Sequence, residues 1–283
     1  MKASKCWLVV LIVVLLLPNV AASSDPATEA LEKGRALQAK GDRVLAITEF
    51  TEAIRLNPKV ADAFNCRGIA YDDNGEHDKA IVDFTEAIRL DPEFADAYDN
   101  RAIAYWYLHE FDKAIDDCTE AIRLQPHYAA AFSNRAMAYQ DKGDHDKAIA
   151  DCTEAIRFNP QLAAAYFLRG LAYHEKGEDD RAIVDCTEAI RLDPTFAEAY
   201  NNRGVAYAGK GEQAKAEEDF AQAKKLGYKQ TPGRKMPSRF LMDPRFMVLI
   251  LVVVIGLVVY CVQRALSGRP VPEPNDVQNL SDQ

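Results

Sequence analysis

The chain has 283 residues, 48% of them apolar and 27% charged, which is the composition of a folded protein rather than a disordered one. Its formal net charge at pH 7 is −9. This acidic balance argues against a nucleic-acid binder, because contacts with a phosphate backbone need a basic surface.

The first 22 residues have the pattern of a secretory signal peptide. Lys2 and Lys5 precede an uncharged, mostly apolar run over residues 6–17, and small residues follow up to Ala22. We expect cleavage after Ala22. The alternative is an N-terminal membrane anchor that is not cleaved, although the apolar run is short for a membrane span.

From Ala27 onwards, one pattern repeats with a period of 34 residues. A proline marks the same position in five of six repeats, and the sixth has Tyr228 there. A regular period of this length predicts a stacked repeat architecture. The repeats, numbered 1 to 6, are residues 27–60, 61–94, 95–128, 129–162, 163–196 and 197–230.

Each repeat predicts two amphipathic helices joined by a turn. In repeat 2, residues 64–73 and 78–90 both carry large apolar side chains three or four positions apart. A glycine lies between the two helices in five repeats and suits a left-handed residue at a helix end, whereas His109 replaces it in repeat 3. One hairpin cannot bury both of its faces, so we expect the six hairpins to stack.

The apolar and small residues of the repeat resemble the tetratricopeptide repeat family. They follow the order aromatic-x3-Gly-x2-Tyr, then Ala-x3-Phe, then Ala and Pro. In repeat 2 they are Phe64, Gly68, Tyr71, Ala80, Phe84, Ala87 and Pro92. The resemblance implies an all-α fold, a right-handed superhelical solenoid of six helical hairpins. It also implies a concave groove, lined by the first helices, that holds a peptide or a helix of a partner protein.

Four polar positions also recur, and in repeat 2 they are Arg67, Asp83, Glu86 and Arg89. They could form a functional charge pattern. We interpret them instead as ion pairs within and between hairpins that fix the stacking register.

Three cysteines, Cys118, Cys152 and Cys186, are also 34 residues apart. They take the position that Phe84 has in repeat 2, which is a packing position. Equivalent helices of neighbouring hairpins are about 9–10 Å apart or more, which is too far for a disulfide. We therefore expect core thiols rather than a disulfide or metal ladder.

No catalytic pattern stands out from the repeats. The five histidines are scattered, and the sequence lacks a phosphate-binding glycine loop, a Gly-x-Ser-x-Gly motif and an HExxH motif. We therefore expect no enzymatic activity, no cofactor, no metal and no small-molecule substrate. The competing hypothesis is an enzyme or metal carrier built on the repeats, with His174 and Glu175 as the residues to test.

The groove residues follow from the spacing of the first helix. Repeat positions 2, 5, 9 and 12 are three or four residues apart and form one stripe. Trp106, Tyr107 and Phe167 are notable because no packing position needs an aromatic residue there, and exposed aromatic residues often anchor a partner. The predicted groove residues are Asn65, Ile69, Asp96, Asp99, Asn100, Ile103, Trp106, Tyr107, Asn134, Met137, Phe167, Leu171 and Asn202.

Members of the resembled family that grip chaperone C-termini use a clamp of Lys, Asn, Asn, Lys and Arg. Only the asparagines are present here, at repeat position 6, as Asn100, Asn134 and Asn202, and the lysine positions hold acidic or neutral residues. A free carboxylate ligand is therefore disfavoured. An acidic entrance and an apolar floor predict a basic or amphipathic segment, bonded through its backbone to these asparagines.

Beyond the sixth repeat the composition changes. Residues 229–245 carry five basic residues and one acidic residue with several Pro and Gly, which predicts a basic linker. An uncharged apolar run follows between Arg245 and Arg264, and it predicts a transmembrane helix over residues 246–263. The last residues, 264–283, predict a disordered tail.

Together these features predict a membrane-anchored scaffold for protein–protein interaction. The signal peptide would place the repeats outside the cytoplasm. The basic residues before the span, and the unpaired cysteines, favour the opposite orientation. A structural subunit of a membrane complex that binds through its convex face is an alternative function.

Overall fold

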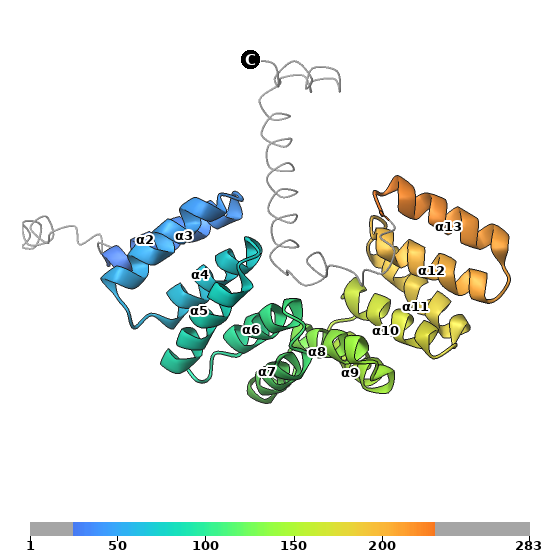
Figure 1. Cartoon of the computed structure of the whole chain (residues 1–283), viewed down its shortest axis with the longest axis horizontal. Coiled ribbons are helices and arrows are strands. Elements are labelled where there is room, and N and C mark those ends of the chain that lie inside the picture. The colour runs from blue at the N-terminus through green and yellow to red at the C-terminus, as the bar shows by residue number, and fades with distance from the viewer. Residues whose placement is uncertain (1–24, 230–283) are drawn as a thin grey trace, which may run out of the picture. The chain divides into compact units, whose positions relative to one another are not determined.

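The computed structural model describes residues 25–229, which form twelve α-helices and no strand (Figure 1). The predicted signal peptide, transmembrane helix and tail lie outside the described residues. None of the described helices is long and apolar enough to cross a bilayer. The helices are α2 (Pro26–Ala39), α3 (Arg43–Leu56), α4 (Ala61–Asp73), α5 (His77–Leu90), α6 (Ala95–Tyr107), α7 (Phe111–Leu124), α8 (Ala129–Lys142), α9 (His145–Phe158), α10 (Ala163–Glu175), α11 (Asp179–Leu192), α12 (Ala197–Gly209) and α13 (Gln213–Lys225).

Successive helices pair into six hairpins, which confirms the predicted all-α fold of helical hairpins. The hairpins belong to two compact units. The N-terminal unit, up to Leu124, contains the hairpins α2/α3, α4/α5 and α6/α7, and the C-terminal unit, from Gln125, contains α8/α9, α10/α11 and α12/α13. Within each unit, the second helix of a hairpin packs against the first helix of the next hairpin.

The core of a hairpin depends on a large side chain lying against a small one. Phe84 on α5 is 1% exposed, and a Cβ atom added to Gly68 on α4 would lie 2.6 Å from its ring. In repeat 5 the same two positions hold Gly170 and Cys186, and a Cβ on Gly170 would lie 3.0 Å from the Cys186 sulfur. The glycine therefore lets the two helices approach around a bulky ring.

The three recurring cysteines are buried and unoxidised, as predicted for core thiols. Burial raises the pKa of the Cys186 thiol to about 12, and the carboxylate of Asp185 adds to this increase. Burial raises the pKa of Cys152 still further. These thiols therefore stay protonated and unreactive near neutral pH.

The recurring arginine and aspartate form a two-pronged ion pair inside the hairpin. Arg67 donates to both carboxylate oxygens of Asp83, at 2.7 and 2.8 Å, and also to Thr51 Oγ1 of the preceding hairpin at 3.2 Å. The predicted role in stacking is therefore confirmed for this pair. It is wrong for Glu86 and Arg89, which pair with each other on the exposed face of α5.

The same arrangement recurs in later repeats. In repeat 3, Arg101 donates to Asp117 and to Thr85 of the preceding hairpin. Burial raises the pKa of Asp117, while the hydrogen bonds from Arg101 oppose this increase. The carboxylate thus depends on its arginine to remain charged.

The turn between the helices requires a left-handed residue. The turn glycines have φ between 74° and 85°, and His109 has φ of 60°. Both observations confirm the prediction for this turn. A non-glycine residue in this conformation is strained, because its Cβ approaches the backbone.

Replacing His109 with glycine should stabilise the chain by about 1 kcal/mol, because it removes this strain. Urea denaturation of a fragment comprising residues 25–229 measures the change. The matched control is Gly75→His, which puts the strained residue into the equivalent turn of repeat 2 and should destabilise by a similar amount. A loss of stability in the His109→Gly variant would show that contacts of the imidazole, such as its edge-to-face contact with Phe111, outweigh the strain.

Candidate partner-binding surface

The first helices carry the residues predicted to bind a partner. We call repeat positions 2, 5, 9 and 12 of α4 and α6 the N-terminal stripe, and the same positions of α8, α10 and α12 the C-terminal stripe. The N-terminal stripe comprises Asp62, Asn65, Ile69, Asp72, Asp96, Asp99, Ile103 and Trp106. The C-terminal stripe comprises Ala130, Ser133, Met137, Gln140, Ala164, Phe167, Leu171, His174, Glu198, Asn201, Val205 and Ala208.

Position 5 lies in the contact between first helices rather than on an open surface. Asn65 is 5% exposed and Asp99 is 4% exposed. Asn65 Oδ1 accepts a hydrogen bond of 3.0 Å from Asn100 Nδ2, which joins α4 to α6. The prediction that Asn65 and Asp99 face a partner is therefore wrong. The Asn100 amide is also already engaged within the protein, contrary to its predicted role in holding a ligand backbone.

Other residues of the N-terminal stripe remain accessible. Asp96 is exposed, and Ile69, Ile103 and Trp106 are partly buried. Ile103 and Trp106 therefore leave some apolar surface accessible on α6, whereas Ile69 packs against the core around Phe84. Asp62 at the same surface forms an ion pair with Arg35 of α2.

The two aromatic residues at the end of α6 have different environments. The Tyr107 ring stacks on the His77 ring of the preceding hairpin, with centroids 4.5 Å apart and planes at 9°. The His77 Nδ1 atom also lies 2.6 Å from a carboxylate oxygen of Asp72. Tyr107 thus has a packing role that was not predicted from the sequence. Trp106 meets the Tyr107 ring edge-on at 5.2 Å.

Phe167 is not the exposed anchor that the sequence predicted. It is 1% exposed, and its ring lies 4.9 Å from that of Phe196. The reason is again position 5, which points into the contact with the neighbouring first helix. Met137 is also buried, whereas Leu171 on the same stripe is partly accessible.

Phe167 also changes the polar contact at this junction. It occupies the position of Asn65, so repeat 5 has no amide oxygen at the position from which Asn65 accepts the hydrogen bond of Asn100. The Asn202 Nδ2 atom is buried and has no hydrogen-bond partner in the part of the chain that the structure describes. The predicted groove residue Asn134 is likewise buried, on α8.

Replacing Asn202 with leucine, the residue at the same position of α10, should stabilise the chain by about 1 kcal/mol. The change removes a buried donor that has no acceptor. The matched control is Asn100→Leu. It should destabilise the chain, because it removes the amide that donates a hydrogen bond to Asn65 Oδ1. Urea denaturation of both variants gives the comparison. Equal losses of stability in both would mean that Asn202 has a polar partner in the folded chain.

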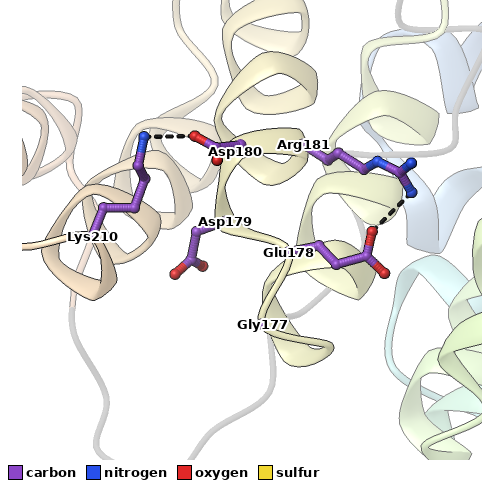
Figure 2. Close-up of a pocket in the computed structure, with 6 residues that line it drawn as sticks. All are labelled: Gly177, Glu178, Asp179, Asp180, Arg181 and Lys210. Carbon is purple, nitrogen blue, oxygen red and sulfur yellow. Dashed lines mark hydrogen bonds and ion pairs between the residues drawn. The ribbon is translucent and has the colours of Figure 1, made fainter.

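A pocket of about 390 Å³ lies at the turn of repeat 5. Figure 2 shows two ion pairs among its charged side chains: Lys210 bonds to Asp180 at 2.5 Å, and Arg181 bonds to Glu178 at 2.8 Å. Lys176 and Asp146 make the equivalent bond one repeat earlier, at 2.6 Å. The pocket is therefore part of a lysine–aspartate ladder between hairpins. This ladder was not predicted from the sequence, although its residues recur every 34 positions.

The residues named for the competing hypothesis have structural roles. His174 Nδ1 lies 2.6 Å from Asp179 Oδ1 and so links the two helices of its hairpin, while Glu175 is exposed. Within residues 25–229, no cluster of three or more His, Cys, Asp or Glu side chains could hold a metal ion. The geometry of the described residues thus gives this hypothesis no support.

Stacked hairpins with accessible first helices define a helical-repeat protein of the kind that binds other polypeptides. Models of the tetratricopeptide repeat match residues 61–94, 95–128 and 129–162, and another matches residues 197–226. A further model, described as a TPR repeat, matches residues 170–211. The chain belongs to the tetratricopeptide repeat family, whose members are scaffolds for protein–protein interaction and typically not enzymes. A search of curated proteins gave no match.

Several solved structures are similar to this chain. A MamA protein is 29% identical over 62% of this chain and 95% of its own, with a TM-score of 0.52. YrrB, described as a TPR protein with an unusual peptide-binding site, is 24% identical over 63% of this chain and 92% of its own, with a TM-score of 0.50. The Cut9-Hcn1 structure of the APC/C is 20% identical over 78% of this chain and 43% of its own, with a TM-score of 0.67. The last two similarities show a shared fold.

Proposed function

We propose that this chain is a membrane-anchored scaffold that binds a peptide or an amphipathic helix of a partner protein on its first helices. The observation that carries the proposal is the accessible part of the N-terminal stripe on α6, where Ile103 and Trp106 are partly exposed and Asp96 is exposed at the start of the same helix. A partly exposed tryptophan is a common anchor of a protein interface. The peptide-binding site named for YrrB is consistent with this proposal.

The composition of the stripes indicates the chemistry of the partner segment. Of the four carboxylates of the N-terminal stripe, Asp99 is buried and Asp96 is exposed, and the C-terminal stripe contains one carboxylate, from Glu198. The C-terminal stripe offers Leu171 and Val205 as accessible apolar surface. A basic or amphipathic segment would suit both the carboxylates and the apolar surface. Its cations would pair with carboxylates, and its apolar side chains would be removed from water.

The anchoring rests on sequence alone. Residues 1–22 act as the signal peptide, residues 229–245 as a basic linker and residues 246–263 as the transmembrane helix in this proposal. The repeats then lie outside the cytoplasm, and residues 264–283 lie inside. Protease treatment of intact cells, with sequencing of the mature N-terminus, tests this topology. Repeats that are protected in intact cells but digested after lysis would establish the opposite orientation.

The partner interaction is tested by purifying the full-length chain from its native membrane and quantifying the proteins that accompany it. Trp106→Ala should lower the recovery of a specific partner about ten-fold or more, because loss of an interface anchor costs about 2 kcal/mol or more. The matched control is Val82→Ala on α5, whose side chain is 67% exposed on a second helix. Val82→Ala should leave recovery unchanged. The reverse result would support a structural subunit that binds through its second helices.

A further inference from the structure

Two adjacent apolar side chains are exposed at the turn of repeat 1. Val44 and Leu45 lie in the first turn of α3 and are 70% and 56% exposed. Leu37, near the end of α2, is partly accessible as well. Single apolar residues on a surface are common, such as Val82 on α5, but two neighbouring ones at the end of a hairpin leave a patch of apolar surface in water.

Neither residue follows the pattern of the other repeats. Repeat 5 has Asp180 at the position of Val44, where it takes part in the lysine–aspartate ladder. Repeat 2 has Lys79 at the position of Leu45, and its amine lies over the Tyr71 ring, 5.3 Å from the centroid. Repeat 1 thus has two exposed apolar side chains at positions where other repeats have polar side chains with partners.

Basic residues flank the apolar pair. Lys40 and Arg43 are exposed, and neither makes an ion pair in the part of the chain that the structure describes. Residues 40–45 hold these two cations and one carboxylate, Asp42, so their net charge is +1. The equivalent residues 74–79 of repeat 2 hold one lysine and two carboxylates, so their net charge is −1 with the histidine neutral. The turn of repeat 1 is therefore both more apolar and more basic.

Apolar side chains between unpaired cations match the boundary of an anionic bilayer. Lipid phosphates would attract Lys40 and Arg43, and the aliphatic side chains of Val44 and Leu45 would enter the acyl region next to the headgroups. A protein partner or a second copy of the chain fits this patch less well. A stable protein interface needs about 20 residues from each side, and the end of one hairpin offers only a few.

We propose that the tip of repeat 1, residues 40–45, inserts into the surface of an anionic membrane. Val44 and Leu45 would lie among the upper acyl chains, with Lys40 and Arg43 beside lipid phosphates. The inference rests on the membrane anchoring in the proposed function, because a few side chains hold a bilayer weakly unless a second attachment keeps them near it. The tip would give the N-terminal unit its own contact with the bilayer.

The test uses the full-length chain in vesicles of phosphatidylglycerol and phosphatidylcholine, with Thr48 replaced by photoreactive benzoyl-phenylalanine. Thr48 is exposed on α3, one turn beyond Val44, so the probe leaves the tip itself unchanged. After irradiation, mass spectrometry should find lipid attached to residue 48. The matched control has the same probe at Val82, the equivalent position of repeat 2, and should give only background labelling. Flotation of the vesicles reports separately whether the chain is anchored.

Two variants test the two parts of the tip. Val44→Asp with Leu45→Lys introduces the residues that repeat 2 has at these positions and keeps the net charge. It should lower the lipid yield about ten-fold, because the apolar surface is lost. Lys40→Gln with Arg43→Gln should also lower it about ten-fold or more, since each basic residue near an anionic leaflet strengthens binding about five-fold. In vesicles of phosphatidylcholine alone, this second variant should have little effect. All four positions are exposed, so the helical circular dichroism of both variants should match that of the native chain.

The inference is overturned if the chain floats with the vesicles while the probe at residue 48 attaches no more lipid than the probe at residue 82. It is also overturned if the probe labels a second copy of the chain instead of lipid, or if neither variant changes the lipid yield. In these cases flotation still supports the anchoring, and the proposed function stands. A chain that does not float with the vesicles contradicts the anchoring and overturns both.

Discussion

Replacing Phe84 with alanine is expected to lower the free energy of unfolding by about 3–5 kcal/mol, as is usual for a phenylalanine removed from a core. The ring is buried in the hairpin of α4 and α5, and a Cβ atom added to Gly68 would collide with it. The cavity cannot be filled by a small shift of one helix, because α4 and α5 also pack on the neighbouring hairpins. Urea denaturation of residues 25–229 measures the loss.

In the Phe84→Ala variant, the α4/α5 hairpin should also unfold locally before the whole array unfolds, since repeats of this kind contact only their neighbours. Hydrogen exchange is therefore expected to increase first in α4 and α5. The matched control is Val82→Ala on the exposed side of α5, which should change stability by less than about 0.5 kcal/mol. Similar losses in both variants would mean that Phe84 does not form the core of this hairpin.

The cysteine repeats offer a second control for the same site. Repeat 3 has Ala102 and Cys118 at the positions of Gly68 and Phe84. The variant Phe84→Cys should be destabilised by a cavity, and adding Gly68→Ala should recover about 1 kcal/mol by filling space and favouring the helix. In the presence of Phe84, Gly68→Ala should instead destabilise by about 1–3 kcal/mol through overpacking. The sign of the Gly68→Ala effect thus reports the size of the opposite side chain.

The fold was predictable from the sequence because the same packing unit occurs six times along the chain. A single apolar stripe is ambiguous, but its recurrence every 34 residues fixes the two helices, the turn and the small residues at close contacts. Even His109 could be assigned its left-handed conformation, since five glycines occupy the same turn.

The candidate site was predicted less well. Helical spacing identifies the face on which Asn65, Asp99 and Phe167 lie, but not how deeply the next first helix covers that face. Position 5 is buried by this neighbour, whereas positions 9 and 12 of α4 and α6 remain accessible. Burial of this kind depends on contacts between repeats, which periodicity within one repeat does not contain.

One contact between repeats could have been recognised from the sequence. Asn65 and Asn100 lie at positions 5 and 6 of successive repeats, and an amide pair there suggests a bond between adjacent first helices. The replacement of this amide by Phe167 in repeat 5 would then have indicated a packed aromatic residue rather than an exposed one. By contrast, the stacking of Tyr107 on His77 joins two unlike repeats and left no periodic signal.

Replacing Asp83 with alanine is expected to destabilise the chain by about 3 kcal/mol. The Asp83 carboxylate is almost fully buried and accepts two hydrogen bonds from Arg67, whose own side chain is 17% exposed. Without Asp83, the guanidinium is left in a largely dry site with Thr51 as its remaining hydrogen-bond partner on the neighbouring hairpin. Arginine stays protonated in proteins, so loss of its proton cannot relieve the unpaired charge. Urea denaturation gives the magnitude.

Two further variants separate the value of the ion pair from the cost of breaking it. Glu86→Ala removes a carboxylate from the same helix, but its bond to Arg89 is exposed, so the change should stay below about 0.5 kcal/mol. Replacing both Arg67 and Asp83 by leucine should be much less harmful than Asp83→Ala alone, since no buried charge remains. If the double variant is as unstable as Asp83→Ala, the pair contributes net stability to the hairpin. If the double variant is nearly neutral, the pair serves mainly to hold Arg67 against Thr51 and so to set how one hairpin stacks on the next.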